Sequence, residues 1–173
     1  GSVTERKNPK IIIESLETID GNVSLEIIGQ TPNLKYLKEL NNLISSSKHA
    51  ENITMTPFIK AEELISKYSS ANLFILPSKS EGLGRVIIEA QSTACPVLVS
   101  SNTGMVDLII ENETGYIFEN NNKNDLSNKI QHIMNNYESA LQTGLNSKDF
   151  VKENQSVANF EFGYKKLIDL VSI

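Results

Sequence analysis

The segment SEGLGRVIIEAQ, residues 80–91, decides the fold together with the apolar run LFILP that precedes it at residues 73–77. A short apolar run closed by proline is typical of a strand buried in a mainly parallel sheet. Residues 85–93 are then predicted to form a helix, and its sheet-facing positions are Val86, Ile87 and Ala90. The two glycines between strand and helix allow a sharp turn and a close approach to a ligand.

Two carboxylates bracket this glycine turn, Glu81 in the loop and Glu89 in the helix. Eight residues at the rise of a helix span ~12 Å. A helix start favours an anion, whereas carboxylates accept hydrogen bonds from hydroxyls and repel phosphate. A ligand with hydroxyls at both ends and phosphate between them, such as a nucleotide sugar, fits this pattern. In the alternative, the glycines only form the turn and both glutamates are solvated, and the spacing alone favours neither interpretation.

The composition indicates an ordinary globular protein of one domain. The chain has 173 residues, of which 39% are hydrophobic and 21% charged. Its net charge is −5 and it has no block of lysine or arginine, which argues against nucleic acid as the main partner. A local positive patch at a phosphate site remains compatible with that charge. No apolar run reaches the length of a membrane span, and no signal peptide is visible.

Cysteine and histidine are too few for a metal or disulfide framework. Cys95 is the single cysteine, so no disulfide can form within the chain. We expect Cys95 to pack at a helix–strand junction and not to act as a nucleophile, because no base is placed for it. His49 and His132 lie far apart in the sequence and are predicted to be surface residues, so no zinc site is expected.

Strands and helices alternate about six times along the chain, which predicts a doubly wound α/β fold with a mostly parallel, six-stranded sheet. A first strand is expected to have ended before residue 1. The predicted strands within the chain are residues 24–29, 53–56, 73–76, 97–100 and 115–118. The predicted helices are 9–19 with Asn8 as N-cap, 34–44, 61–68, 85–93, 104–110 and 126–136, then short pieces broken at Gly144 and Asn146, and a terminal amphipathic helix at 157–173.

Ligands of such sheets bind beyond the carboxyl ends of the strands. Four polar loops with glycine or proline are predicted to lie at that edge: residues 2–7, 57–60, 80–84 and 101–104. The candidate site is therefore expected where these loops meet. Because the chain begins with Gly1-Ser2, which is typical of a remnant of tag removal, we interpret residues 1–173 as one domain excised from a longer protein.

The order of motifs resembles the C-terminal, donor-binding domain of family-four-type glycosyltransferases with the GT-B fold. The resemblance covers residues 1–136 and is carried by GSVTERKNPK, SLEIIGQTP and the string from NITMTPFIKAEELISKY to ENETGYIF. The acidic pair Glu81 and Glu89, with seven residues between, is the signature of that family. The resemblance implies transfer of a sugar from a nucleotide diphosphate sugar with retention of anomeric configuration, usually without a metal.

The resemblance also implies residue roles. Glu89 would hold the ribose hydroxyls, and Glu81 would contact the transferred sugar near the reaction centre as the catalytic carboxylate. Lys7 would neutralise the diphosphate. The other donor-binding residues would be Phe58 and Ile59 beside the nucleobase, the backbone amides of Gly82, Leu83 and Gly84, and Thr103. Thr103 has the alternative role of capping a helix at residue 104, Arg85 that of assisting phosphate or pairing with Glu89, and Lys7 that of a solvated loop residue.

No cofactor or metal is expected, because a lysine and helix-start amides stabilise the charge of a departing diphosphate. The resemblance implies an N-terminal, acceptor-binding domain in the same protein, through which peripheral membrane association would arise. It further implies a cytoplasmic location, including the inner face of the cell membrane, and a role in bacterial surface polysaccharide synthesis. Residues 1–173 alone are expected to bind donor weakly and to transfer nothing.

Three positions depart from the family pattern: Ser2 replaces arginine, Ala94 replaces glycine at the end of the central helix, and Asp107 replaces glutamate. An alanine in the left-handed conformation would cost about 1 kcal/mol. The competing function is a non-catalytic nucleotide-binding or regulatory module with the same fold. A phosphate-receiver module would need aspartates at strand ends, and neither SLEIIG nor LFILP offers one. An epimerase or phosphorylase of the same two-domain plan would keep the phosphate loop.

Overall fold

In a computed structural model of the chain, residues 1–82 and 84–154 are described. The strands are β1 (Leu25–Ile28), β2 (Ile53–Thr56), β3 (Phe74–Leu76), β4 (Val97–Ser100) and β5 (Tyr116–Phe118). The α-helices are α1 (Pro9–Leu16), α2 (Leu34–Ser46), α3 (Ala61–Ser70), α4 (Val86–Ser92), α5 (Lys123–Asn135) and α6 (Tyr137–Asn154). Two short 3₁₀-helices, η1 (Ala50–Asn52) and η2 (Val106–Leu108), complete the described elements.

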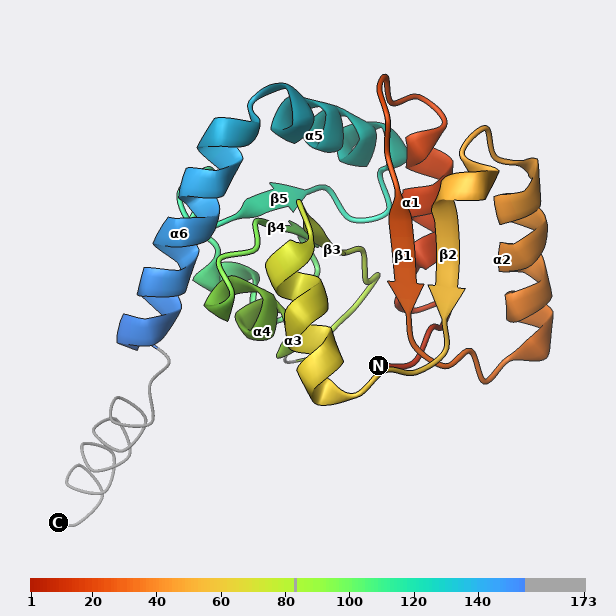
Figure 1. Cartoon of the computed structure of the whole chain (residues 1–173), viewed down its shortest axis with the longest axis horizontal. Helices are drawn as coiled ribbons and strands as arrows, with labels where there is room; N and C mark the ends of the chain where they lie inside the picture. Colours follow the sequence, from red (N-terminus) through yellow and green to blue (C-terminus); the bar gives the residue numbers. More distant parts are fainter. Residues whose placement is uncertain (83, 155–173) are drawn as a thin grey trace, which may run out of the picture.

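All strand pairs are parallel, which confirms the predicted α/β fold with a parallel sheet. β1 pairs with β2, and β3, β4 and β5 form a second sheet in that order. The described residues therefore contain five strands in two sheets, and they do not include the sixth strand that the sequence predicted. Figure 1 shows β1 and β2 beside α1 and α2, with α3 and α4 next to β3, β4 and β5.

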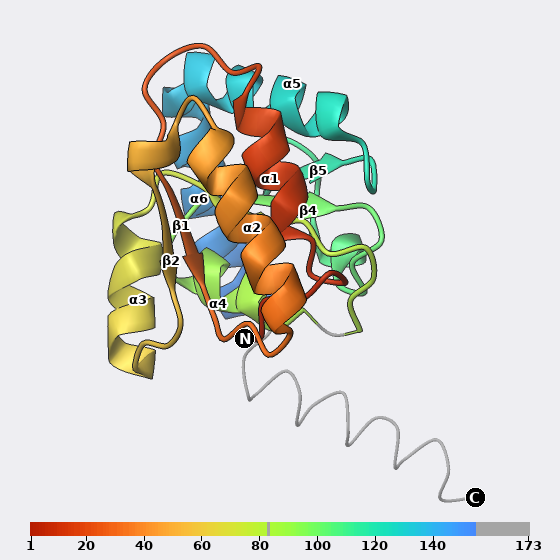
Figure 2. The same ribbon diagram turned by 90° about the vertical axis from the view of Figure 1, so that its right-hand side faces the viewer.

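Helices cover both faces of the second sheet. Leu98 of β4 packs into a core cluster with α1, α2 and α5, whereas Val97 and Val99 pack into a cluster with α3 and α4. Successive side chains of a strand point to opposite faces, so the three buried hydrophobic residues of this one strand belong to two cores. This burial on both sides is the doubly wound arrangement, and Figure 2 shows the helices around the strands from the side.

The N-terminal segment joins the carboxyl ends of the two sheets. Ser2 forms a parallel bridge with Gln30, just after β1, and the Val3 amide donates to the Gln30 carbonyl at 2.7 Å. Farther along the same segment, the Arg6 carbonyl accepts a hydrogen bond of 2.8 Å from the Lys79 amide, just after β3. Residues 2–6 therefore lie across the edge at which the sequence predicted a site, and the N-terminus lies beyond the arrowheads of β1 and β2 in Figure 1.

Three predictions of secondary structure are wrong in detail. α1 ends at Leu16 and not at residue 19, and the Asn8 side chain does not cap it, because Asn8 adopts the left-handed conformation with a φ of 52°. The predicted helix 104–110 is only the 3₁₀-turn η2, in which the Leu108 and Ile109 amides donate to the Met105 and Val106 carbonyls three residues back.

The third error concerns residues after Tyr137, where α6 runs unbroken through Gly144. The missing side chain of Gly144 lets α6 approach the end of α4: an added Cβ would lie 2.2 Å from the Ala94 carbonyl oxygen. Gly144 is thus a packing position within a helix and not the helix break that the sequence suggested. The terminal helix predicted at 157–173 lies outside the described residues.

Cys95 follows α4 and is buried, as predicted, at a helix–strand junction. Burial raises the pKa of its thiol to about 11, and a protonated thiol is a poor nucleophile. Within residues 1–82 and 84–154, no helix has the length and apolar character needed to cross a bilayer.

Candidate functional site

Loops that follow β3, β4 and β5 are tied together at the carboxyl edge of the second sheet. Glu81 forms a parallel bridge with Thr103, and the Gly104 amide donates to the Glu81 carbonyl at 2.7 Å. The Lys79 carbonyl accepts from the Asn102 and Asn120 side-chain amides at 3.4 and 3.3 Å. The loop that carries Glu81 is therefore held from two neighbouring loops.

Two glycines make this close approach possible. A Cβ on Gly104 would lie 1.7 Å from the Gly82 carbonyl oxygen, so the two loops meet backbone to backbone. Gly84 has a φ of 55°, in the left-handed region that glycine adopts without steric cost. Together they bring the backbone of Glu81 and Gly82 against the loop after β4, while Gly84 lies two residues before α4.

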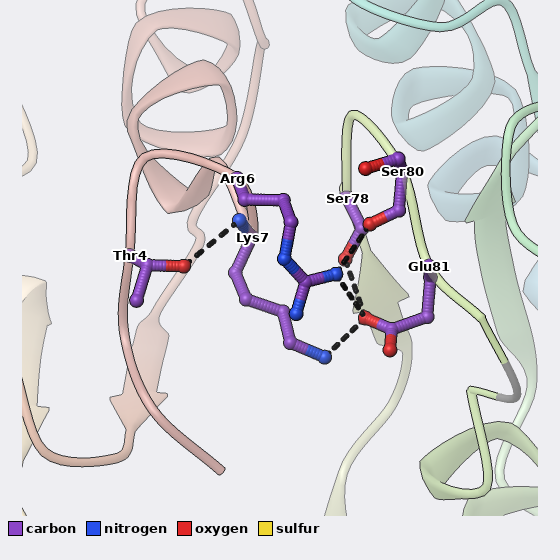
Figure 3. A network of polar contacts seen from close by, with 6 residues as sticks. All are labelled: Thr4, Arg6, Lys7, Ser78, Ser80 and Glu81. Atoms are coloured by element: carbon purple, nitrogen blue, oxygen red, sulfur yellow. Dashed lines mark hydrogen bonds and ion pairs between the residues drawn. The ribbon is translucent and has the colours of Figure 1, made fainter.

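Three side chains, those of Arg6, Lys7 and Ser78, converge on Glu81 and its loop, as Figure 3 shows. Lys7 Nζ forms an ion pair and hydrogen bond with Glu81 Oε2. The same oxygen accepts from Ser78 Oγ at 3.3 Å and lies 3.5 Å from Arg6 Nη1. Arg6 Nη1 also donates to the Ser80 carbonyl at 2.6 Å. The network thus connects the segment before α1 to the loop after β3.

The electrostatics of this network keep Glu81 ionised. Burial of Glu81 opposes ionisation, but the hydrogen bond and charge of Lys7, then the charge of Arg6 and the hydroxyl of Ser78, outweigh it. The pKa of Glu81 is therefore lowered from its ordinary value. Near neutral pH the cluster holds one carboxylate and two cations, which leaves it one positive charge in excess.

The turn that presents Lys7 is formed by residues 4–8. The Lys7 amide donates to Thr4 Oγ1 at 3.3 Å, and the Asn8 amide donates to the Thr4 carbonyl at 3.0 Å. Asparagine is among the few residues other than glycine that adopt the left-handed conformation readily, and Asn8 uses it here to turn the chain into α1. Pro9 then occupies the first helical position, where its missing N–H costs nothing.

Glu89 lies exposed on α4, eight residues beyond Glu81. Only residues from Val86 onward are helical, so the predicted ~12 Å of helical rise does not apply to the whole interval. The negative charge of Glu89 acts on the phenol of Tyr68, which belongs to α3. Burial, followed by the charge of Glu89, raises the pKa of Tyr68, and its ring packs edge-on against Phe74 with centroids 5.3 Å apart.

The remaining predicted residues are distributed as follows. Phe58 lies in the loop after β2 with 72% of its surface exposed, and Ile59 beside it is half-buried. Thr103 is buried, does not cap η2, and has a hydroxyl without a hydrogen-bond partner among the described residues. Gly82 is exposed and Gly84 buried, while Leu83 is outside the described residues.

Four contributors to this edge were not predicted as site residues: Arg6, Ser78, Gly104 and Asn120. Arg6 and Ser78 both contact Glu81, and Asn120 links Ser100 to the loop after β3. The sequence showed Arg6 beside Lys7, which is a usable signal. Asn120 stands in an asparagine-rich loop, where nothing in the pattern separates it from its neighbours.

A pocket of about 300 Å³ opens on the α1 and α2 side of the same edge. Its lining residues are Glu5, Asn8, Lys10, Lys35, Tyr36, Glu39 and Lys79. Lys10 is already paired with Glu39 at 2.5 Å. None of the predicted donor-binding residues lines this pocket, so the site around Glu81 is an open edge and not this hollow. Among residues 1–82 and 84–154, no three histidine, cysteine or acidic side chains are grouped as a metal site would require.

Comparison with known proteins identifies the family of the chain. Residues 1–150 match the family model described as glycosyl transferases group 1. An uncharacterized glycosyltransferase of Methanocaldococcus jannaschii is 30% identical over 155 residues, which are 88% of this chain and 42% of that protein. The capsular polysaccharide biosynthesis glycosyltransferase CapM of Staphylococcus aureus is 30% identical over 141 residues, 78% of this chain and 35% of CapM.

A solved structure shows the same fold. The crystal structure of Anabaena HepE in complex with UDP and glucose has a TM-score of 0.88 and 18% sequence identity, over 100% of this chain and 47% of HepE. This likeness confirms the Rossmann-like α/β fold of GT-B proteins. The chain spans less than half the length of each of these three proteins.

Proposed function

Because the chain belongs to the glycosyl transferases group 1 family, we propose that it is the donor-binding domain of a retaining, family-four-type glycosyltransferase that transfers a hexose. The donor is a nucleotide diphosphate sugar, and the acceptor is a glycan or a lipid-linked glycan. The single observation that supports this most is the ion pair of Lys7 with Glu81 at the carboxyl edge of the sheet, where Glu81 also bridges Thr103.

The proposed reaction breaks the bond between the anomeric carbon of the sugar and the diphosphate oxygen, and the electron pair leaves with the diphosphate. A new bond forms from an acceptor hydroxyl oxygen to the anomeric carbon on the same face, and that hydroxyl loses its proton. Lys7 stabilises the charge that grows on the diphosphate, so no metal or other cofactor is required. Glu81 lies next to Lys7 and holds a hydroxyl of the transferred sugar near the anomeric carbon.

The other site residues hold the rest of the donor. Glu89, exposed on α4, accepts hydrogen bonds from the two ribose hydroxyls. Phe58, whose ring is largely exposed, and Ile59 border the nucleobase. The backbone amides of Gly82, Leu83 and Gly84 and the side chain of Thr103 are assigned to the sugar and diphosphate in this proposal, and the Thr103 hydroxyl has no hydrogen-bond partner among the described residues.

The acceptor side of the reaction belongs to a further, N-terminal domain in this proposal. The chain spans 42% of the M. jannaschii relative and 35% of CapM, which leaves room in those proteins for such a domain. The name of CapM supports a role in surface polysaccharide synthesis for this protein too. The location would be the cytoplasm or the inner face of the cell membrane, with membrane association through the acceptor-binding domain.

Binding of UDP, GDP and ADP to the chain, detected by NMR on the ligand, tests this proposal. We expect one diphosphate to bind selectively and Glu89→Ala to weaken its binding about tenfold or more, because two charge-assisted hydrogen bonds to the ribose are lost. Glu138→Ala is the matched control, since Glu138 is also an exposed glutamate at a helix but lies on α6, far along the chain from the site.

Transfer should require the full-length enzyme, so the chain alone should release no sugar to an acceptor. Absence of binding by the folded chain and by the full-length protein would contradict the proposal and favour a regulatory module. If Glu89→Ala and Glu138→Ala weaken diphosphate binding equally, the assignment of Glu89 to the site is wrong.

A further inference from the structure

We propose that Arg6 is a second cation for the donor diphosphate, acting beside Lys7 and anchored to the loop that carries Glu81. This inference rests on the proposed function, because it assigns a further residue to the same site. It concerns a side chain that neither the sequence motifs nor the comparisons assign to the site.

The guanidinium of Arg6 is held at the loop and still open to solvent. Nη1 donates to the Ser80 carbonyl at 2.6 Å and lies 3.5 Å from Glu81 Oε2. The Arg6 side chain is 51% exposed, against 26% for Lys7 and 13% for Glu81. In Figure 3 the guanidinium lies between the N-terminal segment and the loop of Ser80 and Glu81. A ligand approaching this edge therefore meets Arg6 before it meets the buried part of the network.

The charges and hydrogen-bond donors of the network leave the Arg6 guanidinium available to a phosphate ligand. Three donors share the single oxygen Oε2 of Glu81, whereas a carboxylate oxygen offers about two lone pairs. The Arg6 contact is the longest of the three, so Glu81 is already satisfied by Lys7 and Ser78. Two cations against one carboxylate leave one positive charge uncompensated beside Glu81.

The geometry of arginine suits the remaining task. All partners of the guanidinium within the described residues are bound at Nη1, which leaves the N–H groups of Nε and Nη2 for a ligand. A guanidinium presents its donors as a planar fork that matches two oxygens of a phosphate, which a lysine cannot do. The Ser80 contact fixes this fork in place, so less side-chain entropy is lost when the phosphate binds.

The competing role for Arg6 is purely structural. Its backbone carbonyl accepts from the Lys79 amide at 2.8 Å while its side chain holds the Ser80 carbonyl, so Arg6 also clamps residues 4–8 to the loop after β3. A clamp would support every part of the site equally. If Arg6 binds phosphate, its loss should weaken the binding only of ligands that carry phosphate. This difference separates the two roles.

The test measures dissociation constants by calorimetry for inorganic pyrophosphate, for UDP, GDP and ADP, and for the matching nucleosides. We expect Arg6→Gln to weaken the binding of the preferred nucleoside diphosphate and of pyrophosphate about tenfold, and to leave the affinity for the nucleoside unchanged. Arg6→Lys should retain part of the affinity, since it keeps the charge but loses the fork. Lys67→Gln is the control, because Lys67 is 47% exposed and paired with Glu26, outside the network around Glu81.

Two results would overturn the inference while the proposed function stands. In the first, wild type and Arg6→Gln bind the diphosphate equally well. In the second, Arg6→Gln weakens the binding of nucleoside and of diphosphate by the same factor, as expected if Arg6 only holds the two segments together. If wild type binds no nucleotide but binds pyrophosphate, and Arg6→Gln loses that binding, the phosphate site stands and the nucleotide-sugar function fails. If neither the wild-type chain nor the full-length protein binds nucleotide or pyrophosphate, both fail.

Discussion

Ala94 is the residue at which this chain departs most visibly from a favourable local conformation. It has a φ of 63°, in the left-handed region. The Cys95 amide donates to the Ala90 carbonyl at 3.2 Å and the Ala94 amide to the Gln91 carbonyl at 2.9 Å, which is the Schellman arrangement that ends α4. Glycine is the usual residue at this position because it has no Cβ to strain. The family resemblance had marked Ala94 as standing where glycine commonly ends the central helix, and the structure shows the left-handed conformation there.

We therefore expect Ala94→Gly to raise the free energy of unfolding. Removing the strained Cβ gains about 1 kcal/mol, and the greater freedom of glycine in the unfolded chain offsets part of it, which leaves a net gain of ~0.5 kcal/mol or more. Denaturant unfolding followed by circular dichroism measures the change. Ala71→Gly is the control, because Ala71 also ends a helix but has a φ of −77°, where alanine carries no strain. Equal destabilisation of both variants would contradict this account.

At the scale of elements, two glycines define how loops and helices approach one another. A Cβ would lie 1.7 Å from a carbonyl oxygen at Gly104 and 2.2 Å from one at Gly144. The first contact is between two loops of the candidate site, and the second is between α6 and the end of α4. The two positions are alike in steric terms and differ in what they hold in place.

This difference yields a paired prediction. Gly144→Ala should destabilise the fold by ~1–3 kcal/mol through overpacking, with little effect on the affinity for a nucleoside diphosphate. Gly104→Ala should push the Gly82 carbonyl away and break the Gly104–Glu81 backbone bond, so the diphosphate affinity should fall at least tenfold. Unfolding midpoints and dissociation constants of both variants decide the matter. Loss of affinity in Gly144→Ala without loss in Gly104→Ala would contradict the assigned roles.

The elements could be predicted from sequence wherever one local signal dominates. The strand at residues 53–56 and the start of the helix at Ala61 were predicted at their observed positions, because the alternation Ile-Thr-Met-Thr, the proline after it and the helical run AEELISKY are local features. Gly144 and the 104–110 segment were misread since their structure depends on tertiary contacts with Ala94 and Glu81. The Lys7–Glu81 contact joins residues 74 positions apart, and no local pattern reports it. Both residues were predicted for the site, but not their direct pairing.

At the scale of the whole molecule, one core joins the two sheets. Ile27 and Ile53 of the first sheet belong to the same buried cluster as Leu98, Tyr116 and Phe118 of the second. α1 and α5 contribute to that cluster and pack against each other. The two described sheets share no strand pair, and they are joined by side-chain packing and by residues 2–6.

We expect the chain to unfold in one cooperative transition despite its two sheets. A shared core couples them, so the calorimetric and van't Hoff enthalpies should agree. Scanning calorimetry measures the first, and circular dichroism melting supplies an independent estimate of the second. A resolved low-temperature transition that removes only β1, β2 and α2 would contradict this coupling.

The burial of Cys95 has a practical consequence for spectroscopy. The chain's single thiol is enclosed and remains protonated at neutral pH, so maleimide reagents should leave the native protein unlabelled. A cysteine introduced at an exposed position such as Lys60 would then react alone. A fluorophore attached there, next to Phe58, would give a reporter of ligand arrival free of background, and the natural cysteine need not be removed.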